Sequence, residues 1–324
     1  MNKQINPPPE NLASQEEIDR LEKVLWNIGV ISRREDIRVF VSGGILRNRL
    51  LGIPMTRNSD IYLTTEKRSD SLILPYIIAN SKGFPDPIVF KESGIVCIHV
   101  ESFNAEFGGI SKDSHWVMDE LQKQQLPLSN LMVETYRCDL TIDTILQDVL
   151  TKQYLDLTQR GMSDIKNRFI KTPLDPMKTI RHNPWVIFGA MESQLELEGT
   201  MDDDLNKMIH VTAPVVSSLS LSGLRKHVEK ILSLQGGQEA LDEFGVSEYI
   251  PKEAYEKPEV EESYRLTEVV PQDTTVSKPP EPGMIRQLVP YKTRSGKIDY
   301  RYIWVHPKNV GKPAATSPKA DMPF

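Results

Sequence analysis

The stretch Val41-Ser-Gly-Gly-Ile-Leu-Arg-Asn-Arg-Leu-Leu-Gly52 joins a β-branched segment to a short helical pattern. Residues 37–41 are predicted to form a strand, because β-branched and aromatic residues favour extended backbone. Residues 45–51 are predicted to form a helix. The two glycines between them let backbone N–H groups approach an anion, and a helix N-terminus favours negative charge. The pattern indicates a phosphate-binding turn, with an ordinary tight turn as the alternative.

The segments around this stretch predict a small mixed α/β unit. Ser14 and Glu17 form a capping box at the start of a helix, which Gly29 is expected to end. Further along, alternating apolar residues predict a helix at 72–80 and strands at 61–64, 88–90, 95–100 and 105–110. Strands and helices mixed in this way are typical of an α+β domain.

The second part of the chain changes character twice. Apolar residues recur at helical spacing between 140 and 250, as in a helix bundle. The next segment is rich in Glu and Pro, which is typical of a linker, and a hairpin pattern follows it. The expected organisation is a mobile N-terminus at 1–13, a head domain at 14–155, a helical neck at 156–250, an acidic Pro-rich linker at 251–284, and a basic β-hairpin and tail at 285–324.

Charge is divided unevenly along the 324 residues. The whole chain carries a formal net charge of −6, which excludes a globally basic nucleic-acid binder. From Pro271 onward there are nine basic and four acidic residues, a net charge of +5. Tyr291, Tyr300, Tyr302 and Trp304 lie among these bases. This segment is predicted either to stack on single-stranded RNA or to dock a protein partner.

The cellular location is predicted from the absence of sequence signals for a membrane span, secretion and disulfide bonds. No apolar run is long enough for a membrane span, and the polar first ten residues resemble no signal peptide. Cys97 and Cys138 cannot make a disulfide framework and have no zinc-ligand spacing. A reducing, cytoplasmic location without membrane contact is therefore predicted.

The motifs in register resemble the class II tRNA nucleotidyltransferase (CCA-adding) and poly(A) polymerase family. That family has a Gly-Gly turn, Arg-Asp, Leu-Leu-Gly and then a strand with Asp-x-Asp. The corresponding residues here are Gly43-Gly44, Arg47-Asn48, Leu50-Leu51-Gly52 and Asn58-Ser-Asp-Ile-Tyr62. Downstream, Ala105-Glu106-Phe107 is similar to a strand with a further acid, and Arg137-Cys-Asp-Leu-Thr-Ile-Asp-Thr-Ile145 to the family's Arg-Arg-Asp block. The resemblance covers roughly residues 15 to 250.

The resemblance implies a fold and a reaction. The fold would be a polymerase-β-like nucleotidyltransferase head, an all-α neck and, in this chain, a small C-terminal β appendage. The reaction would be Mg²⁺-dependent transfer of a nucleotide from an NTP to the 3′ end of an RNA, such as tRNA. Asp60 and Glu106 would be the catalytic, metal-binding carboxylates, and the nucleotide-binding residues would be Gly43, Gly44, Arg47, Arg137 and Asp139.

Several replaced residues leave catalysis open. If Asp60 is the first acid of Asp-x-Asp, the second is Tyr62; if it is the second acid, the first is Asn58. Cys138 interrupts the Arg-Arg-Asp block, and the base-reading Glu-Asp-x-x-Arg element is His182-Asn-Pro-Trp-Val186. Two hypotheses follow. The chain is either a divergent nucleotide-adding enzyme or a non-catalytic scaffold that binds RNA or a protein.

Overall fold

A computed structural model of the chain describes residues 12–57, 60–81, 84, 87–90, 95–100, 103–108 and 114–256. It also describes the backbone of 285–292 and 298–305. Asn58, the linker from residue 257 to residue 284, and the side chains of the C-terminal hairpin lie outside the described residues.

A seven-stranded sheet forms the centre of the head, with the strand order β3-β4-β5-β2-β1-β6-β7. β2 and β5 run parallel, and every other neighbouring pair is antiparallel. The strands are β1 (Val39–Ser42), β2 (Asp60–Thr65), β3 (Ile88–Phe90), β4 (Ile95–Val100), β5 (Phe103–Phe107), β6 (Leu146–Asp148) and β7 (Tyr154–Leu155).

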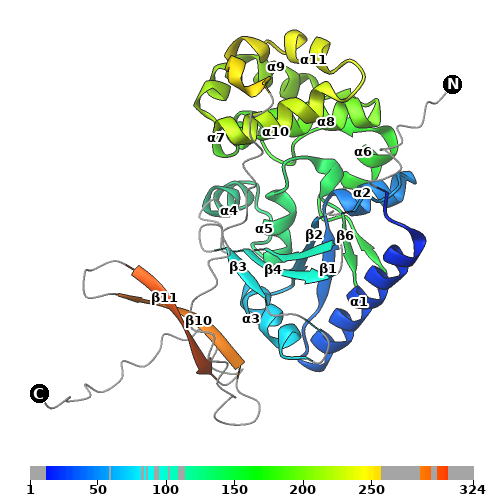
Figure 1. Cartoon of the computed structure of the whole chain (residues 1–324), viewed down its shortest axis with the longest axis vertical. Helices are drawn as coiled ribbons and strands as arrows, with labels where there is room; N and C mark the ends of the chain where they lie inside the picture. The colour runs from blue at the N-terminus through cyan, green and yellow to red at the C-terminus, as the bar shows by residue number, and fades with distance from the viewer. Residues whose placement is uncertain are drawn as a thin grey trace, which may run out of the picture.

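Helices cover both faces of this sheet (Figure 1). On one face, Thr65 of β2 hydrogen-bonds to Ser71 of α3 (Arg68–Ala79), beside α1 (Gln15–Arg34). On the other face, Asn130 of α5 (Asn130–Tyr136) donates to the Thr65 carbonyl, at 2.7 Å, and lies beside Thr64. The short helix α2 (Gly44–Leu51) follows the Gly-Gly turn directly, as the sequence predicts.

Gly29 does not end the first helix, so that expectation is wrong. The capping box of Ser14 and Glu17 is present, but α1 continues to Arg34. A Cβ atom at Gly29 would lie 2.7 Å from Cγ of Leu150, so the glycine lets the helix pack closely against the β6–β7 connection. Close packing, rather than termination, explains this glycine.

Two helices that the sequence analysis did not predict follow β5. α4 (Ser114–Lys123) and α5 pack around a small apolar cluster that includes Val117, Leu121 and Met132. This cluster is separate from the main core, which runs continuously from the head into the neck.

The neck is mostly helical, with two short exceptions. β8 (Phe169–Ile170) and β9 (Thr200–Met201) form a parallel pair that the helical pattern did not predict. The neck helices are α6 (Gly161–Asn167), α7 (Pro176–His182), α8 (Val186–Leu197), α9 (Asp203–Thr212), α10 (Leu221–Leu232) and α11 (Gly237–Glu243). They lie beyond the α2 end of the sheet (Figure 1).

The C-terminal segment contains a two-stranded antiparallel hairpin, β10 (Ile285–Lys292) and β11 (Ile298–Val305). The pairing of these strands confirms the predicted hairpin, and Ser295-Gly296 lie outside the described residues. Within the described part of the chain, no helix has the length and apolar character needed to cross a bilayer.

Candidate functional site

The Gly-Gly turn requires glycine for a geometric reason. Gly43 has φ of +88° and precedes the first residue of α2, so a side chain there would be strained. A Cβ atom at Gly43 would also lie 3.0 Å from Cδ2 of Tyr62. The Tyr62 ring therefore packs directly over the turn that was predicted to hold phosphates.

One face of the sheet beside this turn carries the predicted carboxylates. In the parallel register of β2 and β5, Asp60 lies opposite Asn104 and Tyr62 lies opposite Glu106. The intervening Ile61 is fully buried, so Asp60 and Tyr62 share the same face of β2. The structure thus brings Asp60, Glu106 and the Gly-Gly turn together, with Tyr62 between them.

One oxygen of the Asp60 carboxylate already accepts a hydrogen bond. The amide Nδ2 of Asn104 donates to Oδ1 of Asp60, at 3.0 Å, and Oδ1 of Asn104 lies 2.5 Å from Nδ1 of His99. An amide N–H pointing at the carboxylate occupies a direction from which a cation would otherwise approach.

The electrostatics of this face show that the two carboxylates interact. Burial raises the pKa of Glu106, and the nearby charge of Asp60 raises it further. Burial also raises the pKa of the Tyr62 hydroxyl to about 12, with the charges of Glu106 and Asp60 as further causes. Tyr62 is therefore a neutral hydroxyl at physiological pH and supplies no third charge.

Arg47, a predicted nucleotide-binding residue, makes its contacts within the protein. Its Nη1 atom lies 3.1 Å from Oδ1 of Asp143, and its Nε atom donates to Oδ1 of Asn48. The Arg47 side chain is only 12% exposed. Asp143 belongs to the segment that resembles the family's Arg-Arg-Asp block, so this ion pair attaches α2 to that block.

Arg137 and Asp139 also have partners inside the fold. Nη2 of Arg137 lies 2.7 Å from Oε2 of Glu134, and its Nε atom is buried with no hydrogen-bond partner among the described residues. Nδ2 of Asn183 donates to both carboxylate oxygens of Asp139, at 2.9 and 3.1 Å. Burial nevertheless raises the pKa of Asp139 to about 6.

The segment at 182–186, which corresponds to the base-reading element, is held by internal contacts. The His182 ring stacks on Trp116 of α4, with centroids 4.7 Å apart and planes 3° from parallel. Trp185 stacks on His227 at 5.1 Å. Val186 is fully buried. With Asn183 bound to Asp139, four of the five residues contact other protein groups.

Sequence reasoning missed a charged cluster behind this segment. Glu192 of α8 is buried and contacts both His227, at 2.5 Å, and Lys230, at 2.7 Å. Lys230 also contacts Glu196, at 3.0 Å. The i, i+4 spacing of the two glutamates was visible in the sequence, but their partners on α10 were not.

Among the described residues, the structure shows no carboxylate set for a two-metal centre. Such a centre needs several carboxylates around two cations. Among the residues that the structure describes, no group of three or more His, Cys, Asp or Glu side chains is placed to hold a metal ion. Asp60 and Glu106 are the two predicted carboxylates here, Asn104 already donates to Asp60, and Tyr62 adds a neutral group.

Comparisons with known proteins support the same head fold. Residues 39–171 match the model of the poly(A) polymerase head domain. A tRNA nucleotidyltransferase of Schizosaccharomyces pombe is 22% identical over 221 residues, which is 62% of this chain and 44% of the relative.

Solved structures share the fold. The Bacillus stearothermophilus CCA-adding enzyme in complex with CTP is 21% identical, with a TM-score of 0.57 over 72% of this chain and 54% of that one. The Thermotoga maritima CCA-adding enzyme complexed with tRNA is 15% identical, with a TM-score of 0.57 over 73% and 53%.

The fold and the turn define a nucleotidyltransferase head followed by a helical neck. The chain is similar to class II CCA-adding enzymes and poly(A) polymerases, and its residues 39–171 match the head domain of the latter. It spans about half the length of the relatives named above.

Proposed function

We propose that this chain is a non-catalytic member of the family, a head-and-neck scaffold that binds RNA without adding nucleotides. The observation that carries the proposal is the face of β2 and β5, where Tyr62 lies beside Asp60 and opposite Glu106 and packs on the Gly-Gly turn. Two carboxylates, one of which already accepts a hydrogen bond from Asn104, offer few oxygen ligands with which to hold two cations.

The neck supports the same proposal independently. Selection of an incoming base needs hydrogen-bonding groups that are free to face it. At 182–186 those positions hold a stacked His182, an Asn183 bound to Asp139 and a buried Val186. These side chains hold head and neck together, so they are not available to read a base.

RNA is the proposed ligand because of the scaffold, not because of the catalytic residues. Relatives of this fold include a CCA-adding enzyme complexed with tRNA, and the two-domain core is preserved here over 73% of the chain. The basic segment from Pro271 onward, with a net charge of +5, would add electrostatic attraction to phosphates.

Two binding measurements test the proposal. Calorimetry with CTP and ATP in the presence of Mg²⁺ is expected to give no metal-dependent binding. Fluorescence anisotropy with tRNA lacking its 3′ end is expected to show binding that persists in EDTA and is unchanged in Asp60→Ala. Metal-dependent micromolar NTP binding would contradict the proposal, and undetectable RNA binding would remove its RNA part.

Residual nucleotidyl transfer is the second candidate, and one observation favours it. Asp60 and Glu106 are diagonal neighbours on β2 and β5, and the charge of Asp60 raises the pKa of Glu106, so the two carboxylates interact. This candidate predicts Mg²⁺-dependent incorporation of labelled CMP or AMP that Asp60→Ala abolishes. No incorporation of any of the four nucleotides with Mg²⁺ or Mn²⁺ rejects it.

A further inference from the structure

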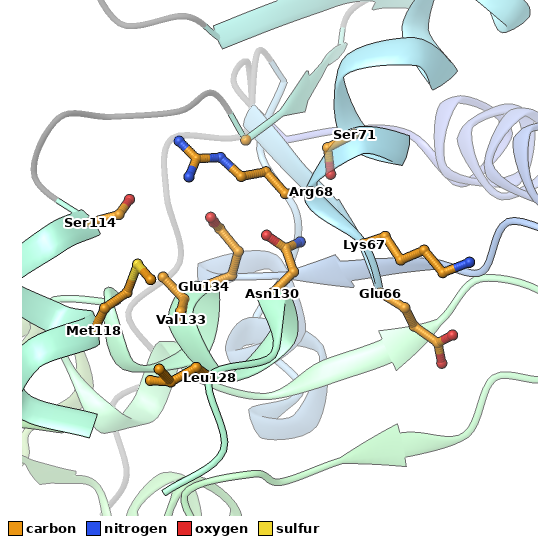
Figure 2. A pocket seen from close by; sticks show the side chains of 11 residues that line it. Glu66, Lys67, Arg68, Ser71, Ser114, Met118, Leu128, Asn130, Val133 and Glu134 are labelled. Atoms are coloured by element: carbon orange, nitrogen blue, oxygen red, sulfur yellow. The ribbon is translucent and has the colours of Figure 1, made fainter. Parts of the chain in front are cut away.

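A cavity of about 190 Å³ lies at the opposite end of β2 from Asp60. Its walls come from the connection between β2 and α3, from Gly108 after β5, and from α4 and α5 (Figure 2). None of the residues assigned to the nucleotide or metal site lines it. The cavity is therefore separate from the Gly-Gly turn.

Two hydrogen-bond donors face this cavity without a partner. The Arg68 guanidinium reaches across it, and no described residue pairs with that group (Figure 2). Ser114 is only 7% exposed, and its hydroxyl has no hydrogen-bond partner among the described residues. The Ser114 hydroxyl is not among the described fully buried atoms that lack a partner, so it is a donor that a ligand in the cavity can reach.

Hydrogen-bond acceptors lie beside these donors. Glu134 points into the cavity (Figure 2), and its Oε2 atom is held by Arg137, at 2.7 Å. Asn130 donates its Nδ2 atom to the Thr65 carbonyl, which leaves its Oδ1 atom as an acceptor. A Cβ atom at Gly108 would lie 3.1 Å from Oε2 of Glu134, so the glycine keeps this wall open.

The remaining lining is apolar. Met118, Leu128 and Val133 lie together along one side of the cavity (Figure 2). Leu128 is 47% exposed and places an apolar edge at the opening. The side chains of Glu66 and Lys67 point away from this group (Figure 2).

This combination selects a class of ligand. A free phosphate or carboxylate would meet Glu134 and the Asn130 oxygen, both of which repel an anion. A purely apolar ligand would make no hydrogen bond to Arg68 or Ser114. A flat heterocycle with both donors and acceptors on its edges, and apolar faces, satisfies all three kinds of lining group.

We propose that this cavity binds the nucleobase of a mononucleotide, and that guanine fits it best. Guanine presents O6 and N7 as acceptors, which an arginine such as Arg68 can bond in a bidentate manner. Its N1–H and N2–H groups are donors that a carboxylate such as Glu134 can accept. Met118, Leu128 and Val133 would cover one face of the ring. This second site goes beyond the proposed function and does not depend on it.

Calorimetric titration of the full chain with GMP, AMP, CMP, UMP and ribose 5-phosphate tests the proposal. GMP is expected to bind about tenfold more tightly than the other nucleotides, because only guanine satisfies both Arg68 and Glu134. Ribose 5-phosphate, which has no base, is expected not to bind. Arg68→Gln and Ser114→Ala are each expected to weaken GMP binding, the former by about tenfold or more.

The matched control is Arg34→Gln, which removes an exposed arginine from the end of α1 and should leave GMP binding unchanged. Circular dichroism confirms that each variant is folded. Equal binding of GMP and ribose 5-phosphate would overturn the proposal in favour of a phosphate site. Failure of every nucleotide to bind at millimolar concentration, or GMP binding unaffected by Arg68→Gln, would also overturn it.

Discussion

The Gly43-Gly44 turn of the head and the 182–186 segment of the neck would face the same nucleotide in a nucleotide-adding enzyme, yet they differ here. The turn keeps its backbone geometry, with Gly43 at φ of +88° directly before α2. In the neck segment, His182 stacks on Trp116, Trp185 stacks on His227, and Asn183 hydrogen-bonds to Asp139. The turn is defined by its backbone geometry, whereas the 182–186 segment is held by contacts of its side chains.

The largest expected effect comes from removing Trp185, which stacks on His227. Its Cη2 atom also lies 2.4 Å from the position of a Cβ at Gly223. Trp185→Ala is expected to lower the free energy of unfolding by about 3 kcal/mol or more, because a large packed ring is lost. Tyr62→Ala, at a side chain 46% exposed, should cost less than about 1 kcal/mol. Urea denaturation measures the free energy of unfolding of both variants. Equal losses would show that the 182–186 segment contributes no more to stability than the face of β2 that carries Tyr62.

The turn itself gives a smaller effect. Gly43→Ala is expected to cost about 1–2 kcal/mol in urea denaturation, because alanine is strained at positive φ. Gly189→Ala is the matched control. Gly189 lies inside α8 with open space around its Cβ position, so alanine there should stabilise by about 0.5–1 kcal/mol. A neutral Gly43→Ala would mean that the turn does not need its conformation.

The contact between head and neck gives a pH dependence. The Asp139 carboxyl keeps its proton up to about pH 6 when folded, against an ordinary pKa of 3.8. Between pH 3.8 and about 6, the Asp139 carboxyl is ionised in the unfolded state but protonated in the folded state. The free energy of unfolding therefore falls as the pH rises through this range. The expected loss is about 1–2 kcal/mol after allowance for partial exposure. Denaturation of wild type and Asp139→Asn from pH 4 to 7 should show this component only in the wild type, and identical profiles would contradict it.

The stack of His182 on Trp116 is the smallest contribution. His182→Ala is expected to lower the free energy of unfolding by about 0.5–1.5 kcal/mol, the usual range for an aromatic pair. His115→Ala removes an exposed neighbouring histidine on α4 and should change stability by less than about 0.5 kcal/mol. Thermal unfolding followed by circular dichroism distinguishes the two variants. If His182→Ala leaves the stability unchanged, the stack on Trp116 does not stabilise the fold.

Local patterns predicted much of the head fold. The capping box at Ser14, the strand before the Gly-Gly turn and the helix after it depend on residues close in sequence, and all are present. Gly29 was misinterpreted because glycine commonly ends helices. Its actual reason, close packing on Leu150, involves a residue far along the chain.

The site was harder to predict, for the same physical reason. The sequence indicated that Arg47, Arg137 and Asp139 belong near a nucleotide. It could not show that Asp143, Glu134 and Asn183 pair with them. The roles of these residues, and of Asp60 and Glu106 as metal ligands, remain predictions. The cavity beside Arg68 had no sequence signal, because four separate segments line it.

Titration with Mg²⁺ tests the central claim most directly, with wild type and Tyr62→Asp compared by calorimetry. The substitution restores a second carboxylate on β2, on the face that Asp60 and Glu106 share. Wild type is expected to bind no Mg²⁺ at millimolar concentration, whereas Tyr62→Asp is expected to gain a saturable site, since each carboxylate adds charge to hold the cation. Two bound Mg²⁺ ions per wild-type chain, lost in Asp60→Ala, would contradict the account.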